Sequence, residues 1–236
     1  MNIKAFTVLA SVFLSACGGA TMTPAPKPVT SPKTPVAYMA NPEASFSTVA
    51  KRVVPLAVTA CREATTNTRC DFSVFVDNRY PEVVNAYQTQ DRSGKPYIVF
   101  SVGLLNTARN EDELAFVLGH ELAHHLAGHL QRQATSSQLG AILAGGVAAM
   151  MGGSNQTVEA VTRIGADVGA RAYSKSHELE ADKLGTLLAL DAGYDPFKGA
   201  QFFTRIPDPG DTFLGTHPPN TARIDMVRST MASVRK

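Results

Sequence analysis

Four of the six histidines of this chain lie in one short stretch, GHELAHHLAGH, residues 119–129, and their spacing suits a metal ion. On an α-helix, residues four apart differ by about 40° in azimuth and about 6 Å in height. His120 and His124 therefore share a face and can direct two imidazole nitrogens at one cation. Glu121 lies about 100° round from His120, beside that cation but not on it, where a carboxylate can take a proton from a bound water. H-E-x-x-H on a helix is typical of zinc-dependent hydrolysis.

A third metal ligand has to come from elsewhere, because a catalytic zinc usually has three protein ligands and one open position. The longer metzincin pattern, H-E-x-x-H-x-x-G-x-x-H, would supply that ligand from the same segment. This chain has Ala127 and Leu130 where the pattern requires glycine and histidine. The metzincin interpretation therefore fails, and we expect the third ligand in another segment.

The stretch SKSHELEADKLG, residues 174–185, offers that ligand. Glu178 and Asp182 are four apart and share a helical face, so Glu178 can bind zinc while Asp182 accepts the free ring N–H of a ligating histidine. Glu180 points about 200° away from Glu178 and is expected to be a solvated charge. An exposed acidic helix face is the alternative, and the upstream motif favours the ligand interpretation.

The remaining histidines of the two segments are expected to lie outside the metal site. His125 and His129 are rotated away from the ligand face, and no glutamate follows His125, so both are predicted to be surface or packing residues. His177 is expected to point elsewhere.

A rigid loop near the C-terminus carries one more candidate. His217 lies in GTHPPN, where Pro218 restricts it to extended backbone. Its imidazole can reach the open zinc position as an inhibitory latch, or hydrogen-bond a developing oxyanion; simple loop packing is the alternative. Arg223 follows as a candidate partner of an oxyanion or of a carboxylate.

The elements around these residues predict an α+β fold that is mainly helical. Helices are expected over residues 41–60, 110–133, 195–206 and 221–234, and one or two long helices over residues 157–194, from the spacing of their apolar residues. Strands are expected over residues 71–77, 83–90 and 96–105, with DRSGK as a turn between the last two. We therefore predict a zincin-like domain with a small antiparallel sheet of about three strands.

The segment 134–158 is uncharged and rich in glycine, and its role is open at this stage. Its apolar centre, LGAILAGGVAAMMGG, is short and weak for a membrane span. A mobile helical hairpin, a lid, a partner-facing surface and a buried helix of small residues all fit the composition.

The N-terminal sequence MNIKAFTVLASVFLSACGG predicts export. Lys4 precedes an apolar run, residues 5–14, that is too short to span a bilayer but fits a secretory signal. The run ends in LSAC, which resembles the lipobox of bacterial lipoproteins, so residues 1–16 are expected to be removed and Cys17 to be lipidated. Gly18 resembles the pattern sorted to the outer membrane. A plain secretory signal with a chance cysteine is the alternative.

Composition divides the rest of the chain. Residues 17–40 are expected to be a Pro- and Thr-rich tether after the lipidated cysteine, and residues 41–236 to be one domain. A net charge of +2 gives no electrostatic case for nucleic acid. Cys61 and Cys70 are expected to form a disulfide in an oxidising compartment, with two buried thiols as the alternative.

Three motifs together resemble a known family. HELAH, then S-[RK]-x-x-E-x-E-A-D with a following glycine, then THPPNTARI, are similar to the HtpX and CAAX-prenyl-protease superfamily of gluzincin zinc metallopeptidases, especially its small periplasmic lipoprotein members of the LoiP and BepA type. The resemblance covers about residues 43–234 and places the loop of His217 near the active site. It implies that His120, His124 and Glu178 are the Zn²⁺ ligands. It also implies that Glu121 is the general base and that Asp182 is an aspartate that supports a ligand.

The resemblance implies a zinc endopeptidase that degrades misfolded or misassembled outer-membrane or periplasmic proteins. We expect it at the periplasmic face of the outer membrane, anchored through Cys17, with the outer-membrane assembly machinery as a candidate partner. The strand of Asn85 and Ala86 is expected to pair with an extended substrate by β-augmentation. The alternatives are a chaperone or assembly factor with a latched zinc site that binds through residues 134–158, and a zinc hydrolase of a non-peptide envelope amide.

Overall fold

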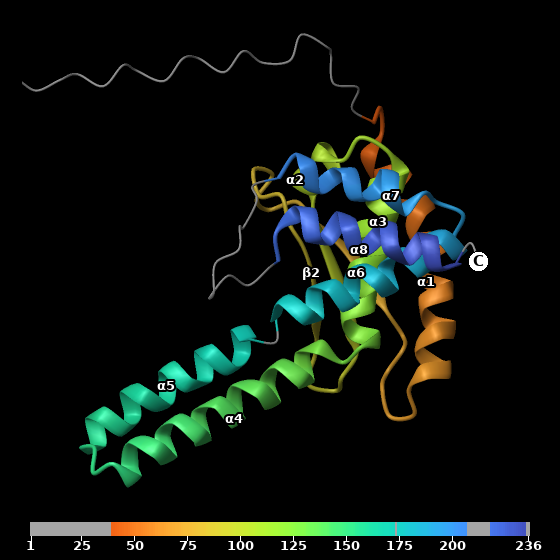
Figure 1. Cartoon of the computed structure of the whole chain (residues 1–236). Coiled ribbons are helices and arrows are strands. Elements are labelled where there is room, and N and C mark those ends of the chain that lie inside the picture. The colour runs from red at the N-terminus through yellow and green to blue at the C-terminus, as the bar shows by residue number, and fades with distance from the viewer. Residues whose placement is uncertain (1–38, 173, 207–217, 235–236) are drawn as a thin grey trace, which may run out of the picture. The chain divides into compact units, whose positions relative to one another are not determined.

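A computed structural model describes residues 39–172, 174–206 and 218–234. The predicted signal, Cys17, most of the tether and His217 lie outside the described residues. The fold is α+β and mainly helical, as predicted (Figure 1). Its elements are α1 (Pro42–Ala64), β1 (Ser73–Asp77), β2 (Ala86–Gln90), β3 (Pro96–Ser101), α2 (Val102–Thr107), α3 (Glu111–Leu126), α4 (His129–Met150), α5 (Asn155–Ala172), α6 (Ser174–Asp191), α7 (Pro196–Gly199), the 3-10 helix η1 (Ala200–Thr204) and α8 (Asn220–Val234).

The three strands form a mixed sheet with the order β1-β3-β2. Strands β2 and β3 are antiparallel, as predicted, and the turn between them uses Gly94 at φ 78°. The expectation of a wholly antiparallel sheet is wrong for β1, which pairs with β3 in parallel from Ser73 opposite Tyr97. Residues 78–85 do not close a hairpin but cross over, so that β3 lies between β1 and β2.

The predicted strand over residues 96–105 is shorter than expected because Ser101 ends it. The Ser101 hydroxyl accepts a hydrogen bond from the Leu104 backbone N–H at 3.1 Å and caps α2. On the inner face of β3, Ile98 and Phe100 are fully buried, and the Phe100 ring lies 4.4 Å from that of Phe46 on α1. This apolar contact fixes the sheet against α1.

The predicted helix over residues 110–133 is two helices, because the chain turns at Gly128. Helix α3 begins after its Asn110 cap and ends at Leu126. Gly128 has φ 64°, in the left-handed region that residues with a side chain rarely adopt, and its N–H donates to the carbonyl of His125 at 3.0 Å. Helix α4 then starts in a new direction at His129.

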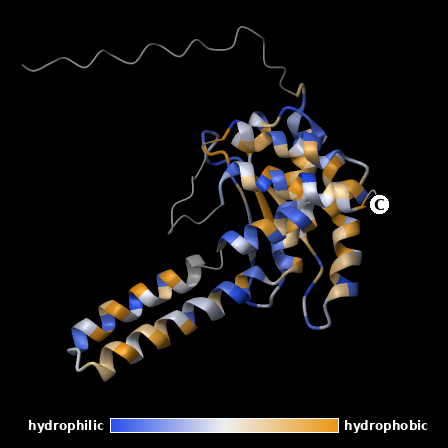
Figure 2. Cartoon of the chain, in the orientation of Figure 1, coloured by the Kyte–Doolittle hydropathy of each residue, from blue (hydrophilic) through white to orange (hydrophobic). Residues whose placement is uncertain are grey.

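Helices α4 and α5 form an antiparallel hairpin, which answers the question left open for residues 134–158 (Figure 1). Glycines set their spacing: a Cβ on Gly140 would lie 2.1 Å from the carbonyl oxygen of Gly165. The interpretation as a buried helix is wrong, because Leu143 is 69% and Met150 is 90% exposed, and apolar residues are visible on the outside of the hairpin (Figure 2). Among the described residues, no helix is both long and apolar enough to cross a membrane.

The predicted disulfide is present between Cys61 and Cys70, whose Cα atoms are 5.8 Å apart. It joins the end of α1 to the segment that leads into β1. Next to it, the backbone carbonyl of Arg69 accepts a hydrogen bond from the ring of His125 at 2.7 Å. The disulfide therefore lies beside a contact between this segment and α3, the helix of the H-E-x-x-H motif.

Candidate metal centre

Facing glycines bring α3 and α6 close together. A Cβ on Gly119 would lie 2.8 Å from the carbonyl oxygen of Gly185, and a Cβ on Gly185 would lie 2.7 Å from the backbone nitrogen of His120. Both distances are shorter than real Cβ contacts, so neither helix has room for a side chain here. The close approach places the acidic face of α6 against the histidine face of α3.

We expect Gly185→Ala to weaken zinc binding by about tenfold or more, the usual scale when the support of zinc ligands is lost. The new methyl group would meet the backbone of α3 and push Glu178 away from His120. The dissociation constant for zinc, measured by competition with a coloured chelator, reports the change. Gly146→Ala in α4 is the control, because its Cβ would meet nothing within 4 Å and alanine favours the helix by about 1 kcal/mol. Equal zinc affinity in both variants would contradict the role given to the glycine contact.

The three predicted ligands converge in the structure. His120 Nε2 lies 3.0 Å from His124 Nε2 and 3.5 Å from Glu178 Oε2, and His124 Nε2 lies 3.3 Å from Glu178 Oε1. A tetrahedral zinc ion with ligand bonds of about 2.0–2.1 Å requires donor atoms about 3.3 Å apart. The residues therefore fit a zinc ion with three protein donors, two imidazoles and one carboxylate.

Asp182 supports the first of these ligands, as its position one turn after Glu178 predicts. It is fully buried, and its Oδ1 lies 2.9 Å from His120 Nδ1. When Nδ1–H donates to this carboxylate, the Nε2 lone pair of His120 is left for the metal. Arg223 on α8 donates to both oxygens of Asp182, at 2.7 and 2.8 Å, and stacks 3.8 Å above the ring of Phe203. Of the two roles predicted for Arg223, the structure thus shows the carboxylate partner.

The charges around the site favour a cation there. Burial opposes ionisation of Asp182, but the Arg223 charge and the hydrogen bonds from His120 and Arg223 hold its pKa below the usual range. Burial and Arg223 also oppose protonation of His120, yet its hydrogen bonds to Asp182 and Glu178 outweigh them and raise its pKa to about 9. The carboxylates of Glu178 and Asp182 outnumber the one guanidinium, that of Arg223, so the ligand atoms lie in negative surroundings.

Glu121 lies in a cleft of about 680 Å³ together with the three ligands. Glu121 is 8% exposed and belongs to α3, the helix that carries both histidine ligands. Asn85 and Ala86 line the same cleft. Within the described residues β2 pairs only with β3, so its other edge faces the cleft.

The structure refines which backbone groups of this strand are available. Ser101 N–H donates to the Asn85 carbonyl at 2.9 Å, so the backbone of Asn85 is directed at β3. Neighbouring residues of an antiparallel strand alternate between the two edges. The N–H and C=O of Ala86 and of Gln88 therefore point to the open side.

His129 is buried and lies outside the set of three donors, as its prediction as a packing residue requires, but it contacts one of the ligands. His129 Nδ1 lies 2.8 Å from Nδ1 of the ligand His124, and His129 Nε2 lies 3.1 Å from Glu180 Oε2. Glu180, predicted to be a solvated charge, also accepts a hydrogen bond from Arg132 at 2.6 Å. Burial is the main cause that lowers the pKa of His129 to about 4, so this imidazole is neutral at neutral pH.

His125 and His177 lie beside the ligands without joining the set of three donors. His125 is buried and packs edge-on against Phe72, as its prediction as a packing residue requires. His177 is also buried, lines the cleft and stacks on the ring of His129 at 4.4 Å. The expectation that it points away from the site is therefore wrong.

Comparison with known proteins agrees with this geometry. Residues 45–231 match the model of peptidase family M48. A beta-barrel assembly-enhancing protease of Yersinia pestis is 30% identical over 152 residues, 56% of this chain and 30% of that protein. A Vibrio cholerae protein to which the same name is provisionally assigned is 36% identical over 119 residues, which are 48% of this chain and 25% of that protein. The mitochondrial metalloendopeptidase OMA1 of Arabidopsis thaliana is 32% identical over 152 residues, 60% of this chain. The matched part spans between a quarter and a third of the length of these relatives.

Proposed function

Since the chain belongs to peptidase family M48, a family of zinc metallopeptidases, we propose that it is a zinc-dependent endopeptidase of the bacterial cell envelope. One observation carries the proposal: three donor atoms with the spacing of a tetrahedral zinc site share a cleft with a glutamate outside that set, Glu121, and with the open edge of a strand. His120, His124 and Glu178 would hold the ion.

Zinc, when bound, supplies Lewis acidity that lowers the pKa of a water molecule and polarises the scissile carbonyl. Glu121 accepts the proton of the attacking water and then passes it to the leaving amine, the part of a general base followed by a general acid. Asp182, held by Arg223, keeps His120 oriented. His217 remains a candidate latch or oxyanion partner.

The substrate we propose is an extended segment of a polypeptide. The outward N–H and C=O groups of Ala86 and Gln88 can pair with the backbone of such a segment, and pairing of this kind recognises main chain more than sequence. Unfolded or misassembled proteins expose extended segments. Two relatives are named for beta-barrel assembly, which supports substrates in the envelope and the assembly machinery as a candidate partner. Lipidation at Cys17 would place the enzyme at the periplasmic face of the outer membrane.

Cleavage of unfolded casein by the zinc-loaded chain tests this function. We expect fragments in the presence of zinc, none after treatment with a chelator, and recovery when zinc is restored. Glu178→Ala should abolish both stoichiometric zinc binding and cleavage, because two histidines alone make a weak site. Zinc binding with no cleavage of any unfolded protein would count against the peptidase activity, and cleavage that resists the chelator would count against the metal.

A further inference from the structure

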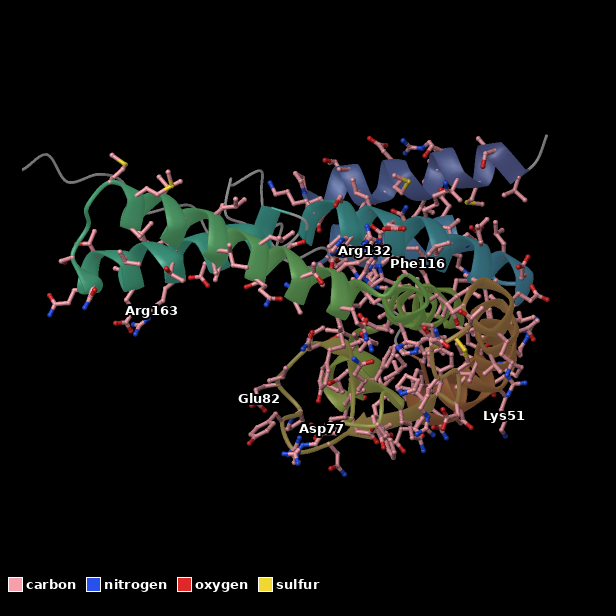
Figure 3. All side chains as sticks on the ribbon, turned by 90° about the horizontal axis from the view of Figure 1, so that it is seen from below. Lys51, Asp77, Glu82, Phe116, Arg132 and Arg163 are labelled. Atoms are coloured by element: carbon pink, nitrogen blue, oxygen red, sulfur yellow. A yellow bond between two sulfur atoms is a disulfide. The ribbon has the colours of Figure 1, made fainter. Side chains whose placement is uncertain are left out.

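A chain of hydrogen-bonding groups leads from the ligand His124 to the protein surface. It runs from His124 to His129, then to Glu180 and to Arg132, with contact distances of 2.8, 3.1 and 2.6 Å. His129 is 4% exposed, whereas the side chains of Glu180 and Arg132 are 41% and 47% exposed. Figure 3 labels Arg132 at the base of the α4–α5 hairpin, close to the other helices, and Arg163 farther out.

The positions of the hydrogens along this series of hydrogen-bonding groups follow from the chemistry of a zinc ligand. A histidine that binds zinc through Nε2 carries its hydrogen on Nδ1. For His124 the group within hydrogen-bonding distance of Nδ1 is Nδ1 of His129, which must then accept. The hydrogen of His129 is therefore on Nε2, where the carboxylate of Glu180 accepts it. Only in this arrangement does each N–H group face an acceptor. The Nε2 lone pair of His124 is then left for the metal, on the same side as the Glu178 carboxylate.

We propose that His129 is a positioning residue of the metal centre: it fixes the tautomer and ring orientation of His124 as Asp182 does for His120, and it is held in turn by Glu180. This inference rests on the zinc site of the proposed function and adds to it a residue that binds neither metal nor substrate. The two histidine ligands are then supported differently, one by a buried carboxylate and guanidinium and the other by a neutral imidazole.

The turn at Gly128 makes the contact possible. On an uninterrupted helix, residues five apart would lie about 140° apart, and the side chains of His124 and His129 would not meet. The left-handed conformation of Gly128 redirects the chain, and His129 folds back onto the end of α3. Stacking on His177 holds the plane of its ring.

Three variants of the full chain separate positioning from packing. His129→Leu removes the acceptor for His124 and should raise the zinc dissociation constant about 10–100-fold, the usual effect of losing such a partner. His129→Asn places an amide oxygen near the former Nδ1, so it should recover most of the affinity although it cannot reach Glu180. His125→Leu is the matched control: it removes an equally buried histidine of α3 that bonds to Arg69 and Gln88, and should leave the zinc dissociation constant unchanged.

The hydrogen itself can be observed by NMR of the zinc-loaded chain with ¹⁵N-labelled histidine. We expect the proton on Nδ1 of His124 and a coupling across the hydrogen bond to Nδ1 of His129, and we expect this coupling to be lost in His129→Leu. A proton on Nδ1 of His129, or wild-type zinc affinity in His129→Leu, would overturn the inference while leaving the zinc site in place. A wild-type chain that binds no zinc would overturn the proposed function and this inference together.

Discussion

Glu121→Gln is expected to slow the cleavage of an unfolded protein by about 10²–10⁴-fold, the contribution of a well-placed general base. Glutamine has nearly the same size as glutamate but cannot accept the proton of the attacking water. Glu121 is not one of the three convergent donors, so zinc should still bind with the wild-type stoichiometry and affinity. Initial rates with fluorescently labelled casein, measured beside zinc content, separate the two effects.

Glu159→Gln provides the control for the same chemical change far from the cleft. Glu159 lies on α5 with its side chain 65% exposed and pairs with Arg163 on the surface, so its replacement should leave the rate of cleavage unchanged. If Glu121→Gln cleaves casein as fast as the wild type, Glu121 is not the base. If this variant is inactive on casein yet keeps its cellular role, the chaperone interpretation gains and proteolysis is not the main task.

The three donors could be predicted from the sequence because helix periodicity is a local property that shows which residues share a face. A spacing of four places His120 above His124, and Glu178 above Asp182, whatever the rest of the fold does. The glycine that follows the second pair, Gly185, is visible in the sequence as well. Its purpose is not, because the partner it admits, Gly119, lies on another helix and only the structure shows the two backbones in contact.

Other features depended on contacts between segments that no local pattern encodes. The alternation in β1 predicts a strand but not its neighbour, and the crossover through residues 78–85 makes it parallel to β3. Continuing the periodicity of α3 through Gly128 makes His129 a surface or packing residue and misses its contact with His124. The glycine was the available signal for a helix end, and a left-handed turn there changes the direction of every later side chain.

Asp182→Ala is expected to lower the free energy of unfolding by about 3–5 kcal/mol, the cost of leaving one partner of a buried ion pair uncompensated. The partner is Arg223, which is 7% exposed and loses both of its short contacts to the carboxylate. Zinc affinity should fall about 10–100-fold in the same variant, because His120 loses the acceptor that fixes its tautomer. Unfolding in urea should be measured with a chelator present, so that lost metal binding is not counted as lost stability.

A double variant distinguishes these two consequences of losing Asp182. Replacing the pair with apolar side chains, Asp182→Leu with Arg223→Met, removes both buried charges and should restore most of the lost stability. It restores no acceptor for Nδ1 of His120, so the zinc dissociation constant should stay as high as in Asp182→Ala. Recovery of zinc affinity together with stability would mean that Asp182 acts on the metal only by holding the fold together. Recovery of stability alone would assign it the separate task of orienting His120, with Arg223 serving to keep that buried carboxylate charged.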